Sequence, residues 1–332
     1  MTGSLNNQKH QLMQEYFLGI DIGGTKCAVI AGTRDMRIIK KVVFPTEVRL
    51  GPYHAISLLL DNASEIADYA GHNLRAIGIS CGGPLDSTKG IILSPPNLPG
   101  WDEIHISEIF TEKFHVPVFL QNDANACALA EWRFGAGKGT RNMVFLTFGT
   151  GMGGGLILSG KLYTGTNDLA GEVGHIRLAD DGPEAYGKKG SFEGFCSGSG
   201  IAQIAKKIAR ERYTSNQIVR FCKSIDDIDN ISARDVAEAA FAGDPTAIGI
   251  LKLSGEYLGK GLSVIIDIIN PEKIVIGSIY ERCRQFIEPS CLEVIRREAL
   301  HPASEVCEIV PSALGEYVGD YASLSVAMLN DE

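Results

Sequence analysis

Two glycine-rich turns, each placed directly after an apolar run, constrain the fold of this chain most strongly. The first lies in residues 21–26, DIGGTK, after the apolar run that begins at Phe17, and the second spans residues 149–155. Glycine at such a position allows a close approach between the backbone and another group. Because this strand–glycine–strand pattern occurs twice, it predicts two related α/β domains that each offer a backbone-lined turn to one ligand.

The composition indicates a folded chain with small-molecule partners. Hydrophobic residues make up 45% and charged residues 21%, which is typical of a globular protein. The 31 basic and 40 acidic residues form no long runs, so we expect no nucleic-acid partner and no membrane partner. The eight cysteines form no CxxC pair and are expected to be reduced thiols. With no apolar stretch suited to a membrane span or signal peptide, the protein is predicted to be cytoplasmic.

Hydrophobic spacing predicts helices and strands in an order that suits two α/β domains. The expected helices are 53–70, 122–133, 201–213, 232–242, 246–269 and 322–329, and the main strands are 17–21, 27–31, 75–80, 116–121, 142–148 and 273–277. The segment 94–101, SPPNLPGW, is too rich in proline and glycine for regular structure. We place an N-terminal domain at 1–121, with the C-terminal helix at about 316–332 packing back on it, and a C-terminal domain at 122–315.

The second turn formally matches the dinucleotide fingerprint G-x-G-x-x-G at residues 149–154. That fingerprint needs a helix directly after the glycines, whereas the next residues, LILSGKLYTG, have a hairpin pattern. We therefore expect both turns to bind phosphate through backbone N–H groups, which suits a polyphosphate. Asp21 beside the first turn is a candidate to hold Mg²⁺, directly or through water, unless its carboxyl only caps the turn.

Six segments of the chain together resemble a single family. They are DIGGTK at 21–26, PNLPGW at 96–101, NDANACALAE at 122–131, TFGTGMGGG at 147–155, AGEVGH at 170–175 and FEGFCSG at 192–198. In their order and spacing they resemble the ROK family of sugar kinases and sugar-responsive repressors, within the actin–hexokinase–Hsp70 superfamily. The resemblance implies a two-domain actin/hexokinase-like (ribonuclease H-like) α/β fold, with ATP–Mg²⁺ and a hexose in the cleft between the domains.

The resemblance also implies a role for each matching side chain. Asp123 corresponds to the catalytic general base, although an aspartate before a helical run also suits an N-cap, and both roles can coexist. The residues implied to bind ATP are Asp21, Gly23, Gly24, Thr25, Lys26, Gly149, Thr150, Gly151 and Gly277. Those implied to bind the sugar are Asn97, Asn122, Asp123, Glu172, His175 and Glu193. Taken singly, His175 would instead suit a structural histidine and Glu193 a solvated loop acid.

One segment departs from the pattern C-x-C-G-x-x-G-C-x-E, whose three cysteines hold a structural zinc ion with a histidine in many members. Here it reads EAYGKKGSFE, with Glu184, Tyr186 and Ser191 at the cysteine positions. These side chains cannot replace a Cys₃His site, so we predict no zinc. Packing by Tyr186 and Phe192 is expected to shape the loop that presents Glu193. Near the adenine, VIGS at 275–278 stands where Gly-Gly is more usual.

The leading functional prediction is an ATP-dependent kinase that phosphorylates a hexose at its 6-hydroxyl. A kinase for an N-acetylhexosamine, such as N-acetylmannosamine or N-acetylglucosamine, fits the same motifs. A repressor of this family carries a helix-turn-helix ahead of its sugar domain, and the 16 residues before Phe17 are too few for that module. A non-catalytic sugar-binding regulator would be expected to lose DIGGTK or Asp123, and both are intact. The resemblance favours a homodimer.

Overall fold

Two five-stranded sheets organise the fold of the computed structural model, which describes residues 15–71, 73–215 and 217–330. Contacts divide the described chain into two units. The first unit contains the residues up to 138, Leu162–Ala170 and the segment from Glu316, and the second contains Gly139–Lys161 and Gly171–Gly315. The mixed α/β architecture confirms the expected fold class. The division places the helix that follows residue 122 in the first unit, beyond the expected boundary at 121.

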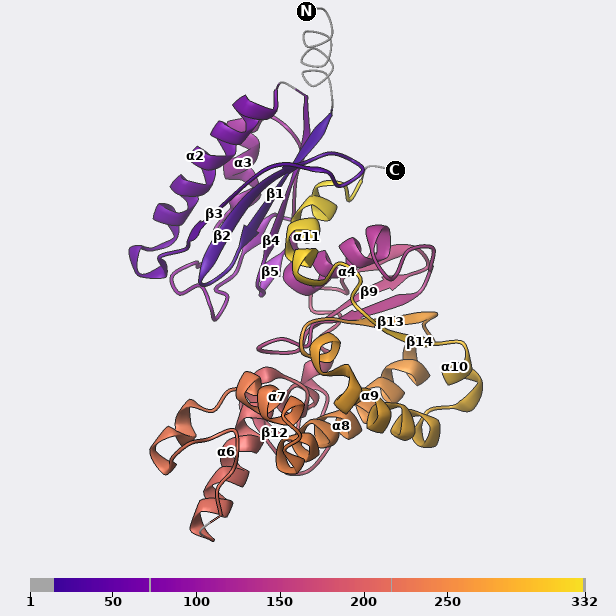
Figure 1. Ribbon diagram of the computed structural model, residues 1–332. Helices are drawn as coiled ribbons and strands as arrows, with labels where there is room; N and C mark the ends of the chain where they lie inside the picture. The colour runs from indigo at the N-terminus through magenta and orange to yellow at the C-terminus, as the bar shows by residue number, and fades with distance from the viewer. Residues whose placement is uncertain (1–14, 72, 216, 331–332) are drawn as a thin grey trace, which may run out of the picture. The chain divides into compact units, whose positions relative to one another are not determined.

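The first unit is built on a sheet with strand order β3-β2-β1-β4-β7. Strands β1 (Tyr16–Ile22), β2 (Lys26–Gly32) and β3 (Ile38–Pro45) are antiparallel neighbours, whereas β4 (Leu74–Cys81) and β7 (Val118–Asn122) continue the sheet in parallel. Helices α2 (Pro52–Ala70) and α3 (Ile106–Phe114) cover one face, and α11 (Val318–Ala327) covers the other (Figure 1). Because both faces are covered, β1 is a nearly continuous apolar run.

The remaining elements of this unit are short, apart from one helix. Helix α4 (Asp123–Phe134) follows β7 directly and packs beside α11. The short elements are η1 (Val48–Leu50), β5 (Leu85–Asp86) and β6 (Ile91–Ile92), and η4 (Gly315–Tyr317) precedes α11. The segment 94–101 has no helix or strand, as its composition predicts.

Helix α11 lies very close to the first sheet because two strand glycines face it. A Cβ atom on Gly78 of β4 would lie 2.1 Å from the backbone nitrogen of Ala327 and 2.2 Å from the carbonyl oxygen of Ser323. A Cβ atom on Gly19 of β1 would similarly lie 2.9 Å from the backbone nitrogen of Leu324. The C-terminal helix is therefore part of the core of the first unit.

The second sheet has the strand order β10-β9-β8-β13-β14. Strand β8 (Met143–Leu146) pairs antiparallel with β9 (Gly154–Leu158), and β13 (Lys273–Ile276) runs parallel to β8 and to β14 (Glu308–Pro311). Strand β10 (Lys161–Tyr163) follows β9 through the expected turn at residues 159 and 160. The helical elements that follow are η2 (Val173–His175), α5 (Phe192–Phe195), α6 (Gly198–Thr214), η3 (Ile225–Asn230), α7 (Ala233–Phe241), α8 (Pro245–Ile269), α9 (Ile279–Glu298) and α10 (His301–Glu305).

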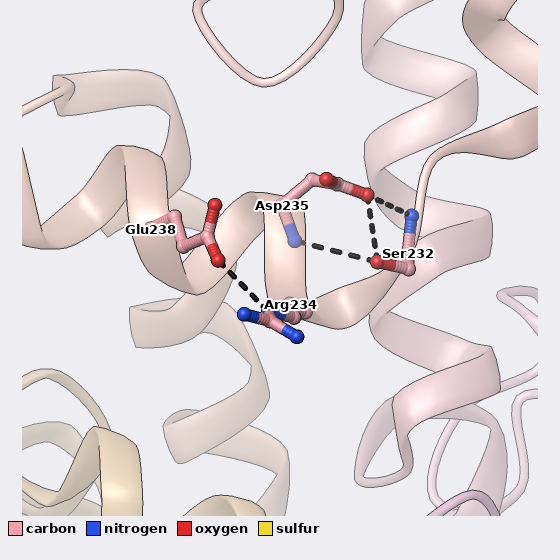
Figure 2. Close-up of polar contacts among 4 residues, drawn as sticks. All are labelled: Ser232, Arg234, Asp235 and Glu238. Atoms are coloured by element: carbon pink, nitrogen blue, oxygen red, sulfur yellow. Dashed lines mark hydrogen bonds and ion pairs between the residues drawn. The ribbon is translucent and has the colours of Figure 1, made fainter.

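Helix α7 has a start that its local sequence determines. The Ser232 side chain accepts a hydrogen bond from the Asp235 N–H, and the Asp235 carboxylate accepts one from the Ser232 N–H (Figure 2). This reciprocal arrangement is a capping box. Figure 2 also shows the ion pair between Arg234 and Glu238, one turn apart at 2.8 Å. The helix that begins here packs against α6 and α8.

The structure matches the expected helices and adds α3, α5, α9 and α10, which the sequence did not predict. The expected helices at 201–213, 232–242 and 246–269 correspond to α6, α7 and α8. No helix was expected over Ile279–Glu298, where α9 lies. Pro289 lies inside α9 and Cys283 has non-helical backbone angles, so the helical pattern is interrupted twice. Among the described residues, no helix is both long and apolar enough to cross a bilayer.

We expect Gly78→Ala to destabilise the protein, because the added methyl group would meet backbone atoms that can move only with the whole of α11. Overpacking of this kind costs about 1–3 kcal/mol. The control is Gly319→Ala in α11, where nothing lies within 4 Å of the new Cβ atom and a neutral or stabilising effect is expected. Thermal unfolding followed by circular dichroism measures both, and equal midpoints for the two variants would contradict the close packing.

Candidate functional site

Two aspartates lie at the same edge of the first sheet. Asp21 is the penultimate residue of β1 and pairs with Ser80 of β4, and Asp123 follows β7, in which Asn122 pairs with Cys81 of β4. Because β1, β4 and β7 are parallel, their carboxyl ends meet at one edge. The structure therefore brings the two predicted acidic residues together in the first unit.

The Asp21 carboxyl has a strongly perturbed pKa. Burial raises this pKa from 3.8 to about 6, and the nearby carboxylates of Asp123 and Asp320 contribute to the rise. Lys26 and Lys41 act in the opposite direction. Asp320 lies in the C-terminal helix α11, where it also forms an ion pair with Lys41 at 2.6 Å. Sequence reasoning did not select Asp320, and its only signal was an acid in the first turn of the last helix.

The first glycine turn is packed against the PNLPGW segment. The Gly23 N–H donates to the Lys26 carbonyl at 3.1 Å, which closes the turn between β1 and β2. A Cβ atom on Gly24 would lie 2.5 Å from the Asn97 carbonyl oxygen, so only glycine fits there. The Asn97 side chain lies along a second glycine, Gly82, after β4. Asn97 is thus next to the turn that contains Thr25 and Lys26, both of which are exposed.

Asn122 is the N-cap of α4, which leaves Asp123 as its first residue. The Asn122 Oδ1 accepts a hydrogen bond from the Asn125 N–H at 2.7 Å. The Asp123 Oδ1 accepts one from the Ala124 N–H at 2.8 Å. Burial raises the pKa of Asp123, and the Ala124 N–H opposes that rise. Asn122, and not Asp123, is therefore the N-cap. The second oxygen of the Asp123 carboxyl is left for a ligand.

The second glycine turn, which we call the phosphate turn, comprises residues 147–153. The Thr147 N–H donates to the Gly153 carbonyl at 2.9 Å, and the Gly153 N–H donates to the Thr147 hydroxyl at 2.8 Å. The start of α6 holds the middle of the turn, since the Gly198 N–H donates to the Gly149 carbonyl at 2.7 Å and the Ser199 hydroxyl to the Thr150 carbonyl at 2.8 Å.

The hydrogen bonds of this turn leave several donors unused. Within the described part of the second unit, the N–H groups of Thr150 and Gly151 and the Thr150 hydroxyl donate no hydrogen bond. Adjacent unpaired N–H groups in a turn form a concave site for an anion. The structure thus leaves these donors of the second turn available to a ligand.

The AGEVGH segment packs closely against the phosphate turn and the start of β9 at two of its glycines. A Cβ atom on Gly171 would lie 2.1 Å from the Gly154 carbonyl oxygen, and one on Gly174 would lie 2.4 Å from that of Met152. Glu172 and His175, which flank Gly174, are both exposed. The segment is therefore fixed against the turn while its two polar side chains remain accessible.

Glu193 joins the same assembly from α5. Its Oε2 accepts a hydrogen bond from the Met152 N–H at 2.8 Å, and the side chain is buried, with the residue 9% exposed. A Cβ atom on Gly151 would lie 2.8 Å from this oxygen. The alternative of a solvated loop acid is therefore excluded for Glu193.

Gly277 lies beside the phosphate turn at the end of β13. Its N–H donates to the Leu146 carbonyl at 3.1 Å, and the Ile279 N–H donates to the Phe148 carbonyl at 2.9 Å. Ser278 between them has φ of 61° and ψ of −110°, a conformation that glycine adopts far more readily. Its hydroxyl accepts a hydrogen bond from Arg282 at 3.0 Å. This backbone conformation explains why glycine is more usual at this position.

Comparison with known proteins identifies the family. Residues 17–322 match the sequence model of the ROK family. The chain belongs to the ROK family. It is 30% identical over 310 residues to a glucokinase of Thermotoga maritima, covering 93% of this chain and 96% of the relative. A xylose repressor of Bacillus spizizenii is 31% identical over 251 residues, which are 74% of this chain and 59% of the repressor.

A solved structure of the family agrees with the fold. The ROK glucokinase of Streptomyces griseus, in complex with glucose and AMPPNP, is 29% identical and superposes with a TM-score of 0.74 over 95% of this chain and 98% of that one. The expected family and the expected fold are therefore both confirmed for this ROK protein.

In this ROK protein a β-hairpin occupies the segment where many members carry the zinc cysteines. Strand β11 (Glu184–Ala185) pairs with β12 (Lys188–Lys189), and the turn residues Tyr186 and Gly187 have φ of 47° and 68°. Positive φ at both positions is typical of a type I′ turn. Tyr186 at the tip is 76% exposed, so the expectation that it packs to shape the loop is wrong. Phe192 is fully buried, as expected.

Hydrogen bonds fix this hairpin to its surroundings. The Lys188 ammonium donates to the His175 carbonyl at 2.7 Å, and Arg177 donates to the Lys189 carbonyl at 2.9 Å. On the other strand, the Gln203 amide both donates to the Glu184 carbonyl and accepts from its N–H. In the described ranges, no group of three or more His, Cys, Asp or Glu side chains is arranged to hold a metal. The lack of zinc stays a prediction.

We expect Ser278→Gly to stabilise the protein, because it removes a non-glycine residue from a strained conformation that costs about 1–3 kcal/mol. The gain is smaller than this cost, since glycine also makes the unfolded chain more flexible. Urea unfolding measures it against Ser304→Gly in α10, which should destabilise by about 0.5–1 kcal/mol. A loss of stability in Ser278→Gly would rule out strain at this position.

We expect Asp21→Asn to stabilise the protein at pH 8 but not at pH 4. The folded pKa of about 6 lies above the usual 3.8, so the folded state binds the proton more tightly and stability falls as the pH rises between these values. A shift of about two units gives an upper limit of about 3 kcal/mol. The matched control is Asp86→Asn, where the Lys89 N–H lowers the pKa of Asp86 and the pH trend should be opposite. Urea unfolding at both pH values decides, and a pH-independent effect of Asp21→Asn contradicts the argument.

Proposed function

We propose that this ROK protein transfers the γ-phosphoryl group of ATP to the 6-hydroxyl of a hexose, with Asp123 as the general base. The observation that carries the proposal is the pair of carboxylates, Asp21 and Asp123, at one sheet edge of a chain that matches a glucokinase over nearly its whole length. A sugar kinase needs a carboxylate to accept a proton and another to organise charge near the phosphates.

Asp123 is suited to act as the general base. Its raised pKa gives the carboxylate a greater affinity for the proton that the sugar hydroxyl releases. As the hydroxyl oxygen bonds to the γ-phosphorus, the bond between that phosphorus and the β–γ bridging oxygen breaks, the proton passes to Asp123, and ADP leaves. The Ala124 N–H fixes one carboxylate oxygen, so the other is held in a defined orientation.

The two glycine turns suit the phosphates of ATP. In the first unit the contributing residues are Gly23, Gly24, Thr25 and Lys26, and in the second they are Gly149, Thr150, Gly151 and Gly277. The unused donors at Thr150 and Gly151 support this assignment. Mg²⁺, when bound, would neutralise phosphate charge. Burial is the larger cause of the raised pKa of Asp21, and the carboxylates of Asp123 and Asp320 add negative charge that a divalent cation would offset, so Asp21 fits a role in holding it through water.

The sugar-binding side chains are proposed from both units. They are Asn97, Asn122 and Asp123 in the first, and Glu172, His175 and Glu193 in the second. Exposed Glu172 and His175 beside buried Glu193 offer donors and acceptors suited to a polyol. We further propose that the protein works without zinc, in the cytoplasm and as a homodimer.

Two other functions are kept as outcomes of the test. An N-acetylhexosamine kinase would use the same base and the same phosphate turns with a different sugar. A sugar-binding regulator is favoured by the likeness to a xylose repressor, of which this chain spans 59%. Such a regulator would bind sugar without phosphorylating it.

We expect ADP release from Mg-ATP in the presence of glucose or another neutral hexose, and little with N-acetylmannosamine or N-acetylglucosamine. Asp123→Asn should lower kcat by about 10²–10⁴ while sugar binding, measured by calorimetry, persists. Asp61→Asn, an exposed site on α2, is the control with the same charge change and should have wild-type activity. Turnover with the acetylated sugars alone would point to the amino-sugar kinase, and binding without turnover to the regulator.

A further inference from the structure

Glu193 is a proposed sugar ligand whose side chain also holds the phosphate turn. Its Oε2 accepts the Met152 N–H at 2.8 Å, and this hydrogen bond is buried. Within the described residues of the second unit, this is the single hydrogen bond that the carboxylate makes, so Oε1 is left for another donor. Among the described residues Oε1 is not one of the buried atoms that lack a partner, so it remains open to a donor from a ligand.

The backbone that carries Glu193 is held firmly. Phe192 before it is fully buried, and its ring lies where a Cβ atom on Gly261 of α8 would be only 2.4 Å away. The Ser191 hydroxyl caps α5 by accepting from the Gly194 N–H at 3.1 Å. On the other side, the Phe195 carbonyl accepts from the Ser254 hydroxyl at 2.9 Å. The carboxylate therefore approaches the phosphate turn from a fixed platform.

The tip of the phosphate turn lies against the Glu193 carboxylate. Gly151 has no side chain and lies against the Glu193 Oε2, where a Cβ atom would be 2.8 Å away. The peptide between Gly151 and Met152 is therefore oriented by the Glu193 carboxylate through the Met152 N–H. The carbonyl of the same peptide, on Gly151, accepts a hydrogen bond from the Gly149 N–H at 3.1 Å. The Glu193 carboxylate therefore acts on the peptide that closes the turn around the unused Thr150 and Gly151 N–H groups.

We propose that Glu193 is a positioning residue that links occupation of the sugar site to the geometry of the phosphate turn. One carboxylate oxygen holds the Met152 N–H, and the other accepts a hydrogen bond from a sugar hydroxyl. A bound sugar thereby fixes the carboxylate, which fixes the turn for the phosphates of the nucleotide. The inference rests on the proposed function, because it takes the ligand of Oε1 to be a sugar.

The experiment measures how strongly the sugar that gives turnover tightens binding of Mg·AMPPNP, by calorimetry with and without saturating sugar. Wild type should bind the nucleotide analogue at least about 5-fold more tightly with sugar, within the usual range of coupling between sites. Glu193→Ala leaves the Met152 N–H without an acceptor, so it should weaken binding without sugar and bring the ratio close to one.

Two further variants separate positioning from simple sugar contact. Glu193→Gln keeps a carbonyl oxygen for the Met152 N–H but presents an NH₂ group to the sugar. It should therefore bind the analogue like wild type without sugar, and lose the sugar-dependent gain. Glu184→Gln, an exposed glutamate on β11 whose contacts are made by its backbone, has the same change of charge and should retain the wild-type ratio.

The outcomes distinguish this inference from the proposed function. If all Glu193 variants raise only the KM for sugar, with nucleotide affinity and its dependence on sugar unchanged, Glu193 is a sugar ligand and the link is wrong. If wild-type turnover is robust but sugar does not tighten Mg·AMPPNP binding, the link is also wrong while the kinase assignment stands. If wild type phosphorylates no sugar, the proposed function fails first and the link, which depends on it, is overturned with it.

Discussion

Close contact between backbone segments, at positions where glycine leaves room, is the constraint on which the candidate residues of each unit depend. In the first unit Gly24 lies against the Asn97 carbonyl, and in the second Gly171 and Gly174 lie against Gly154 and Met152. A single methyl group at any of these positions would separate two functional segments. These glycines therefore act as packing residues that bring a phosphate-binding turn and a polar segment together, in addition to any contact with ligand.

The two units place their charges in opposite ways. In the first, burial raises the pKa of Asp21, the carboxylates of Asp123 and Asp320 add to the rise, and two lysines oppose it. In the second, backbone donors around Thr150 have no partner in the described residues. An excess of negative charge is relieved by a cation, and unpaired N–H groups are satisfied by an anion. Both arrangements are suited to a charged ligand, and perturbed charges of this kind are typical of functional sites.

Local sequence predicted the elements that short-range interactions determine. The strand before Asp21, the turn at Ser159 and Gly160 and the start of α4 all depend on neighbouring residues, and all were located from the pattern. Whether Asp123 is itself an N-cap was left open, because a cap depends on the backbone angles of one residue; the structure assigns the cap to Asn122. The presence of Asp320 near Asp21 could not be predicted, since it follows from long-range packing of α11 on the sheet. The site roles of individual residues were likewise expected from motifs, and the structure adds which of them touch.

The hairpin at residues 184–189 has a consequence for the environment in which the protein can work. Its shape comes from backbone pairing, a turn with two positive φ angles, and contacts from Lys188, Arg177 and Gln203. None of these groups is oxidised or chelated under conditions that would strip a metal from thiolates. If the segment that leads to Glu193 works without zinc, as proposed, a fall in available zinc would leave its geometry unchanged.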